Sequence, residues 1–407
     1  MGIKGVLRML LCLSLLPAAT SWGAEVHGRS STQFLSFSND LADDHRQIEL
    51  AEYLRFSITN IDKAGKFSIY GYGRGTQDFT NGDGLNGRLY YLYGEYRDLF
   101  DKVDLRIGRQ FVNLAAGSAI IDGGQVDLKN IGPVAFSVMG GRDVLFGLDG
   151  EIGDPGNTTF GMAAYLTGYK NTDAEVSWFR KWDGGDNSRD VVGGMIKQYL
   201  FSNLKLYGNA RYDLVSETFN EVQGGVKYYP LSNLIFTGEW YQSYPTFDTT
   251  SIYSVFAVDR YQEGVLRADY TINDQISVNA GYTHEMFGGG GSGSTADVYH
   301  VGASVRPIEP LRVSAEFDQR HGYYGRVGGV IVDAAWDINK SSQVEGGINW
   351  DAYRRDALTG EEIARRYWLG GKYKLAKNMA LSGRIQDDVN IRFTQYISGR
   401  VTFDYDF

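Results

Sequence analysis

Cysteine is nearly absent from the sequence, and the one copy lies in a segment expected to be removed. Cys12 falls within an apolar run, Val6–Leu16, that begins between the basic residues Lys4 and Arg8. The small residues that a signal peptidase requires follow this run: Ala18, Ala19, Ser21 and Gly23. This order predicts a signal peptide over 1–23, with cleavage after residue 23 or 24. A mature chain without cysteine excludes disulfides, thiolate metal sites, a cysteine nucleophile and covalent c-type haem.

Long hydrophobic runs are also missing from residues 24–407, which excludes a helical membrane protein. Proline is scarce (7 residues), whereas Tyr (28), Phe (21) and Gly (52) are abundant. Membrane-spanning strands remain compatible with this composition, because they alternate apolar and polar residues and contain no long apolar run. The formal charge of −9 becomes −11 once the two basic residues of the signal are removed. Such an acidic chain is not expected to bind nucleic acid.

The end of the sequence alternates between apolar and polar residues, with only Gln395 and Tyr396 breaking the pattern, which predicts a strand from Ile391 to Phe407. The apolar face is predicted to carry Ile391, Phe393, Ile397, Gly399, Val401, Phe403, Tyr405 and Phe407. The polar face is predicted to carry Arg392, Thr394, Ser398, Arg400, Thr402, Asp404 and Asp406. Shorter segments such as Ile276–Met286 and Leu311–Asp318 alternate in the same way. Polar faces with charges of both signs need water or a polar partner beside them.

The final residues carry a resemblance to a known family. Val401, Phe403, Tyr405 and the terminal Phe407 resemble the C-terminal assembly signal of Gram-negative outer-membrane β-barrels. The resemblance implies location in the outer membrane as a multi-pass barrel. It also implies contact with outer-membrane lipid and with the barrel-assembly machinery.

Connections between the alternating segments are short and long in turn, as in a barrel with two different rims. The short set is Asp62–Gly65, Asp98–Asp101, Asn130–Pro133, Asn171–Asp173, Ser202–Asn203, Pro230–Asn233, Ile272–Asp274, Pro307–Pro310, Asn339–Ser342 and Leu375–Asn378. The eleven longer connections include Asn113–Ala119, Leu148–Asn157, Asp183–Asp190 and Tyr244–Asp259. The sequence therefore predicts an all-β fold: a transmembrane, antiparallel, up-and-down barrel of about 22 strands, within a range of roughly 18 to 24.

This barrel is expected to be a single domain over residues 24–407. The first strand begins near His27, so no N-terminal plug domain is expected before it. A barrel of this width has a lumen that its own side chains do not fill. An inward-folded loop, water or another protein must therefore occupy it.

Charged residues on the polar faces are the candidates for the lining of the lumen, where rows of charge set ion preference. They are Arg55, Arg74, Arg106, Glu239, Arg312, Glu316, Arg320, Arg384, Arg392 and Arg400. Any one of them is also explained by cross-strand ion pairing. Arg109 falls on the apolar side of its segment, which predicts a bulge or a kink toward the lumen.

The longest connection, Tyr244–Asp259, is unusually apolar. Its residues Phe247, Ile252, Tyr253 and Phe256 predict either a constriction folded into the lumen or a docking surface for a partner. A simple extension of the strands above the membrane explains them equally well.

Residues with catalytic or ligand-binding potential do not form a recognisable set. The five histidines are scattered without metal-ligand spacing, and paired acids such as Glu361 and Glu362 fall in turns or loops. No catalytic residue, metal site or cofactor is predicted, and the chain is not expected to be an enzyme.

Two functions fit these observations. The first is a channel or porin that passes ions or small solutes through a charged lumen. The second follows from an analogy: a wide barrel with short loops resembles the barrel component of porin–cytochrome conduits, which sheathes a periplasmic multihaem cytochrome. Conductance of the barrel alone favours the first, and co-purification with a haem protein favours the second.

Overall fold

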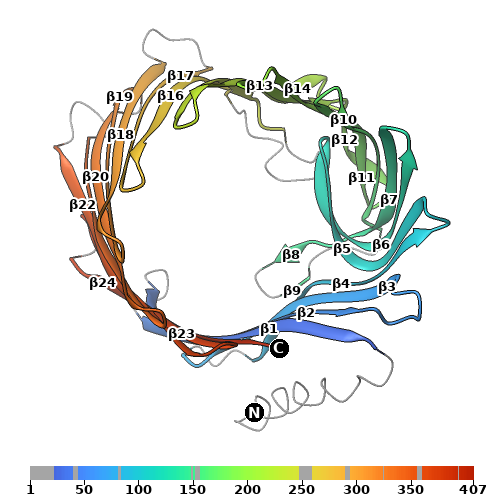
Figure 1. Ribbon diagram of the computed structural model, residues 1–407, viewed down its shortest axis with the longest axis horizontal. Coiled ribbons are helices and arrows are strands. Elements are labelled where there is room, and N and C mark those ends of the chain that lie inside the picture. Colours follow the sequence, from blue (N-terminus) through green and yellow to red (C-terminus); the bar gives the residue numbers. More distant parts are fainter. Residues whose placement is uncertain are drawn as a thin grey trace.

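A computed structural model describes residues 23–39, 45–80, 84–147, 150–151, 156–246, 259–288, 294–323, 325–354, 360–392 and 394–407. Twenty-two strands form one antiparallel sheet, and a separate two-stranded hairpin lies within the ring that they make (Figure 1). The sheet is closed, because β1 pairs with both β2 and β24. The predicted all-β barrel and its strand number are confirmed. The described ranges contain no helix that is long and apolar enough to cross a membrane.

The strands follow one another around the barrel in chain order, each paired with its neighbours. The first seven are β1 (Glu25–Asn39), β2 (His45–Thr59), β3 (Phe67–Asp78), β4 (Asn86–Leu99), β5 (Val103–Leu114), β6 (Gly117–Ile131) and β7 (Val134–Asp143). The internal hairpin is β8 (Phe146–Gly147) and β9 (Gly150–Glu151). The remaining strands are β10 (Thr158–Tyr169), β11 (Thr172–Asp183), β12 (Asp186–Leu200), β13 (Leu204–Asp213), β14 (Thr218–Leu231), β15 (Leu234–Ser243), β16 (Tyr261–Asn273), β17 (Ile276–Phe287), β18 (Thr295–Ile308), β19 (Leu311–Gly322), β20 (Gly325–Asn339), β21 (Ser342–Arg354), β22 (Glu362–Ala376), β23 (Met379–Val389) and β24 (Tyr396–Asp406).

The barrel closes where the two ends of the described chain meet. Gly28 and Phe407 exchange two backbone hydrogen bonds of 2.8 and 3.0 Å. Arg29 of β1 forms a bidentate ion pair with Asp406 of β24, at 2.6 and 2.9 Å. The ring of Phe407 lies over Gly28, where an added Cβ would come within 2.4 Å of the ring. The C-terminal residue is therefore part of the seam that removes the free edges of the sheet.

The connections agree with the sequence at one rim and differ from it at several places on the other. Each of the ten short connections predicted lies between two strands of the barrel. The predicted loops Asn113–Ala119 and Asp183–Asp190 were wrong in length, because β5–β6 and β11–β12 are joined by two residues each. The predicted last strand was also too long, since β24 begins at Tyr396. Arg392 lies in the connection, where its amide donates to the Asn390 side chain at 2.8 Å in a local turn.

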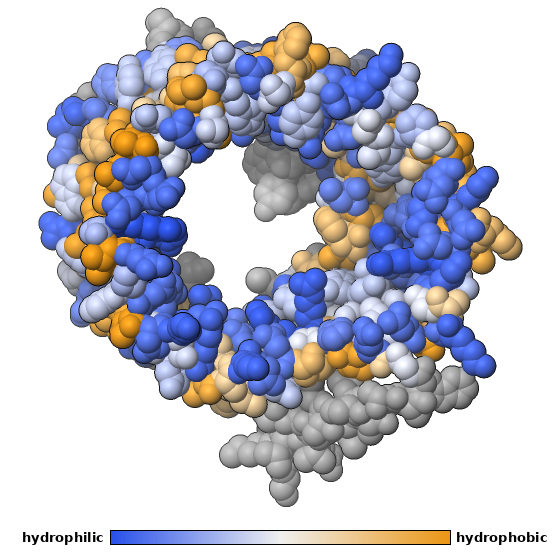
Figure 2. Space-filling view, in the orientation of Figure 1, coloured by the Kyte–Doolittle hydropathy of each residue, from blue (hydrophilic) through white to orange (hydrophobic). Residues whose placement is uncertain are grey.

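The pairing register divides the strand residues into two continuous faces, because residues directly opposite one another project to the same side. One face carries large apolar side chains that are well exposed, such as Leu266 (63%), Val301 (56%) and Leu369 (57%). The other carries most of the charged side chains, and hydrophilic residues line much of the passage through the ring (Figure 2). An apolar exterior around a polar interior is the arrangement of an outer-membrane barrel in lipid.

Three glycines interrupt the wall at one place. Gly108, Gly123 and Gly141 lie directly opposite one another on β5, β6 and β7. An added Cβ on Gly123 would lie 2.1 Å from the carbonyl oxygen of Gly140, and Gly108 has a φ of +128° that only glycine adopts readily. The sheet bends sharply along this glycine row. Beyond it, β5 no longer pairs with β4 after Arg109, and the end of the β5–β6 hairpin turns into the ring (Figure 1).

The inward end of this hairpin packs against the inner side of β10–β13. Val112, Leu114 and Ile121 from the hairpin bury against apolar residues of the wall, among them Met139, Ala163, Phe179 and Val191. The tip is fixed by hydrogen bonds: the amide of Ala116 donates to Ser177 at 2.8 Å, and Arg211 donates to the carbonyl of Ala115 at 2.7 Å. A small hydrophobic core therefore lies inside the barrel.

The glycine row predicts a large difference between two neighbouring substitutions. Gly123→Ala should destabilise the barrel by about 1–3 kcal/mol, because the new methyl group would overlap backbone atoms of β7. Gly124→Ala is the matched control, since its Cβ would lie 3.5 Å from the nearest heavy atom, the carbonyl oxygen of Arg106. The measurement is the temperature at which each folded barrel loses its distinct gel mobility. Equal transitions in the two variants would contradict the role given to the glycine row.

Candidate functional site

The lumen is the candidate functional site, and Arg109 organises the part of it beside the β5–β6 and β8–β9 hairpins. Because the hairpin is folded inward, the side of β5 that would otherwise face lipid turns toward the lumen. Arg109 donates to both oxygens of Asp122, at 2.7 and 2.8 Å, and to the carbonyl of Leu89 at 3.0 Å. It also binds Glu151 of β9. The sequence predicted either a bulge or a kink toward the lumen at Arg109, and the structure shows the kink.

The β8–β9 hairpin belongs to the connection between β7 and β10 and lies inside the ring beside β4 (Figure 1). Glu151 attaches one strand of it to Arg109, and the carbonyl of Gly147 accepts a hydrogen bond from Arg88. The ring of Phe146 packs 5.7 Å from that of Tyr90, measured between centroids. The sequence predicted a loop over Leu148–Asn157 but gave no sign that part of this connection is held inside the lumen.

Six aromatic rings form a continuous row along the inner wall of β3 and β4, which we call the aromatic track. Its members, in order of contact, are Tyr70, Tyr93, Tyr91, Tyr72, Tyr90 and Phe146. Successive ring centroids are 5.2, 5.8, 5.8, 4.9 and 5.7 Å apart. The register shift between Tyr72 and Gly73 leaves Tyr90 as an extra residue opposite β3, so two consecutive tyrosines, Tyr90 and Tyr91, both contact Tyr72.

The register places nine of the ten predicted lumenal charges on the polar face, and their role in permeation stays a prediction. These nine are Arg55, Arg74, Arg106, Glu239, Arg312, Glu316, Arg320, Arg384 and Arg400. Arg392 lies outside the strands. Arg384 and Arg400 lie directly opposite each other, and the Arg384 guanidinium stacks over Trp368 at 4.4 Å. Arg106 pairs with Glu95 at 2.8 Å, and Arg320 pairs with Glu285 at 2.8 Å.

Charge is distributed unevenly around the polar face. From β14 to β21, acids outnumber bases: the acids include Glu221, Glu239, Glu263, Asp269, Glu285, Glu316, Asp318, Asp333, Glu345 and Asp351, and the bases Lys227, Arg267, Arg312 and Arg320. From β22 to β3 the polar face carries both signs: the bases include Arg366, Arg384, Arg400, Arg29, Arg55 and Arg74, and the acids Glu362, Asp388, Asp404, Asp406, Glu49 and Asp78. The sequence predicted charges of both signs but not the excess of acids from β14 to β21.

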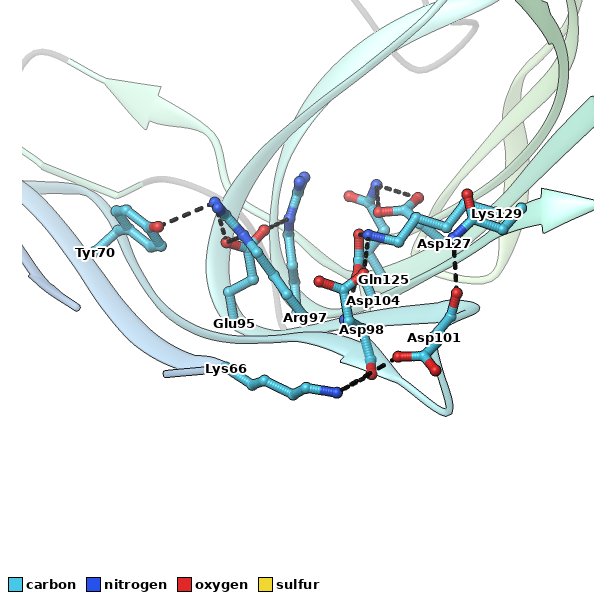
Figure 3. A network of polar contacts seen from close by, with 12 residues as sticks. Lys66, Tyr70, Glu95, Arg97, Asp98, Asp101, Asp104, Gln125, Asp127 and Lys129 are labelled. Carbon is cyan, nitrogen blue, oxygen red and sulfur yellow. Dashed lines mark hydrogen bonds and ion pairs between the residues drawn. The ribbon is translucent and has the colours of Figure 1, made fainter. Parts of the chain in front are cut away.

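A network of polar contacts holds the base of the kinked hairpin near the β4–β5 turn (Figure 3). Glu95 is 2% exposed and accepts from Arg97 at 2.6 Å and Arg106 at 2.8 Å. Lys129 bridges Asp98 and Asp104 at 2.9 and 2.7 Å. The buried carboxylate of Glu95 resists rearrangement, because separating it from Arg97 and Arg106 would leave its charge uncompensated. The network gives the inward hairpin a rigid base.

Two other expectations concern this site. Phe247, Ile252, Tyr253 and Phe256, predicted as a constriction or docking loop, lie outside the described residues. Within the described ranges, no group of three or more His, Cys, Asp or Glu side chains is arranged to hold a metal ion.

Replacement of Arg109 should loosen the β8–β9 hairpin inside the lumen. Arg109→Met removes charge-assisted hydrogen bonds worth about 1.5–3 kcal/mol each. It leaves Arg142, 3.8 Å from Glu151, as the remaining cation beside Asp122 and Glu151. We expect larger and noisier single-channel currents, because β8–β9 would no longer be held at one place. Arg320→Met, on the opposite wall, is the control for loss of a lumenal positive charge. Identical currents in the two variants would show that Arg109 does not hold the β8–β9 hairpin in place.

Comparisons with known proteins bear on the fold. No protein-family model matches the sequence, and the comparison with curated proteins gives no significant match. A mutant of the ferric enterobactin receptor PfeA from Pseudomonas aeruginosa aligns with a TM-score of 0.59 and 12% identity, over 95% of this chain and 81% of that chain. OccAB2 from Acinetobacter baumannii aligns with a TM-score of 0.49 and 12% identity, over 94% of this chain and 98% of that one. A BenF-like porin from Pseudomonas fluorescens gives 0.48 and 9%, over 94% and 98%. The likeness to the receptor shows that this chain has the fold of a Gram-negative outer-membrane β-barrel.

Proposed function

We propose that the protein is a passive outer-membrane channel for ions or small solutes. The observation that carries the proposal is a lumen that is lined largely by polar residues and is narrowed by the chain's own β5–β6 and β8–β9 hairpins. A polar lining stays hydrated, so small charged solutes can pass without losing all contact with water. The hairpins are fixed to the wall by Arg109 and Arg211, which suits a constriction of defined width.

The lumen is open between these elements. Described residues leave a passage through the middle of the ring (Figure 2), and no plug domain is among them. The BenF-like protein with which this chain aligns is named as a porin, and the channel proposed here is of that general class. Passive passage requires no catalytic group, so the proposal treats the chain as a channel and not as an enzyme.

The sheath of a multihaem cytochrome is the less favoured alternative. A partner threaded through the barrel would compete for space with the two inward hairpins. Displacing the β5–β6 hairpin would expose Val112, Leu114 and Ile121, which are now buried against the wall. Such exposure costs about 1.5–3 kcal/mol for each large apolar side chain. The channel needs no displacement.

Reconstitution tests the proposal directly. The purified barrel, inserted alone into a planar lipid bilayer, should give discrete, voltage-independent conductance steps at low voltage. Heat-denatured protein serves as the control. A folded barrel that inserts but stays electrically silent, and that purifies with a haem-staining periplasmic protein, would contradict the channel and favour the sheath.

The separated charges predict opposite effects of two neutralising variants on ion preference. Under a salt gradient, Glu316→Gln combined with Asp318→Asn should shift the reversal potential toward anion permeation. Arg384→Gln combined with Arg400→Gln should shift it toward cation permeation. Both effects follow because lumenal charges enrich the counter-ion within a Debye length of about 10 Å at 0.1 M salt. Shifts of the same sign in both variants would show that these residues do not set the field.

A further inference from the structure

We propose that the inner wall of β1–β4 carries a binding site for aromatic carboxylates, formed by the aromatic track and two neighbouring arginines. The inference rests on the channel proposed above and names a solute class for it. A depression in this wall is lined by Tyr53, Tyr72, Tyr91, Gln33, Arg55 and Arg400. Two of these tyrosines belong to the aromatic track, so the depression opens directly onto the row of rings.

The tyrosines of the track remain in part accessible to solutes. Tyr70, Tyr72, Tyr90, Tyr91 and Tyr93 are each partly exposed, and none is fully buried. Stacked and tilted rings 4.9–5.8 Å apart leave a near-continuous aromatic surface from Tyr70 to Phe146. A planar solute that stacks on such a surface gains about 0.5–1.5 kcal/mol beyond the burial of its area. The wall therefore favours flat, aromatic solutes over saturated ones of the same size.

The two arginines of the depression supply the charge. Arg29, which also lies at this site, is neutralised by its bidentate pair with Asp406 at 2.6 and 2.9 Å. Arg55 and Arg400, by contrast, form no ion pair with an acidic residue of the described chain, and both are exposed. An exposed guanidinium presents paired N–H donors that match the two oxygens of a carboxylate.

The combination defines the ligand class. A cation would be repelled by Arg55 and Arg400, and a small inorganic anion would gain nothing from the tyrosines. A neutral aromatic compound would stack but leave the guanidinium groups unused. An aromatic carboxylate uses both parts of the site at once: its ring lies against Tyr72 and Tyr91, and its carboxylate reaches Arg55 or Arg400. The track continues beyond the depression to Tyr90 and Phe146, which gives the bound ring adjacent positions to move to.

Binding to the folded, detergent-solubilised barrel tests the site without requiring conduction. Three probes are compared by calorimetry: benzoate, cyclohexanecarboxylate, which has the charge without the flat ring, and benzamide, which has the ring without the charge. Benzoate should bind more tightly than cyclohexanecarboxylate by about twofold to tenfold, which is the stacking energy converted to affinity. Benzoate should also bind more tightly than benzamide. Equal affinities for all three probes would overturn the proposal.

Variants separate the two parts of the site. Tyr72→Leu with Tyr91→Leu should abolish the preference for benzoate over cyclohexanecarboxylate while keeping the preference for anions. Arg55→Gln with Arg400→Gln should abolish the preference for benzoate over benzamide while keeping the preference for rings. Tyr241→Leu and Arg312→Gln, on the opposite wall of the lumen, are the matched controls and should change neither. Heat-dependent gel mobility verifies that each variant is folded.

The outcomes distinguish this site from the channel itself. Benzoate binding that both variant pairs leave unchanged would place binding elsewhere and overturn the proposal. Normal conductance without selective benzoate binding would overturn the site and leave the channel standing. Selective binding by a barrel that does not conduct would support the site and contradict the channel.

Discussion

The structure depends on one constraint: in a bilayer, backbone N–H and C=O groups that face lipid must be paired within the protein. The closed sheet meets this constraint along most of its circumference, and the contacts of Arg29 with Asp406 and of Gly28 with Phe407 complete it at the seam. Beyond Arg109, β5 no longer pairs with β4, and side chains on the lumenal side form hydrogen bonds with backbone groups there. Arg109 donates to the carbonyl of Leu89 on β4. The inward-folded β5 therefore supplies a partner for a backbone group beside the break in the wall.

The bend of the sheet at the glycine row determines the shape of the lumen. Successive side chains of a strand point to opposite faces along its whole length, but a sharp bend changes the surroundings of each face. Below the row, Arg106 faces the lumen and Ile107 faces outward; above it, Val112 packs against the inner wall and Arg109 faces the passage. The alternation along β5 therefore places a lumen-lining arginine, residues of the small internal core and Arg109, which binds Asp122 and Glu151, on a single strand. The absence of side chains at Gly108, Gly123 and Gly141 is what permits the bend.

Local signals were enough to predict the barrel, because alternation and turn residues act within a few positions of each other. They located the ten short turns and the outward face of the last strand. They failed where the outcome depends on contacts between distant segments. Ala115 and Ala116 form a tight turn because Glu175, Ser177 and Arg211 hold them from across the wall. Arg392 continues the alternation of β24 in the sequence, but a local turn at Asn390 takes its amide instead. Arg109 was the one residue whose placement signalled the bend.

In the channel proposed here, the net acidity of the chain is a poor guide to ion preference. Many charges of the polar face are already engaged with one another, as Arg106 is with Glu95 and Arg320 with Glu285, and these pairs contribute little field at a distance. Acids are in excess from β14 to β21, whereas both signs occur from β22 to β3, where Arg29 and Arg366 are paired with Asp406 and Asp388. In the proposed channel, a solute therefore meets an acidic wall on one side and, on the other, the exposed guanidinium groups of Arg55 and Arg400. Which wall it follows depends on its own charge, and the aromatic track lies beside these two arginines.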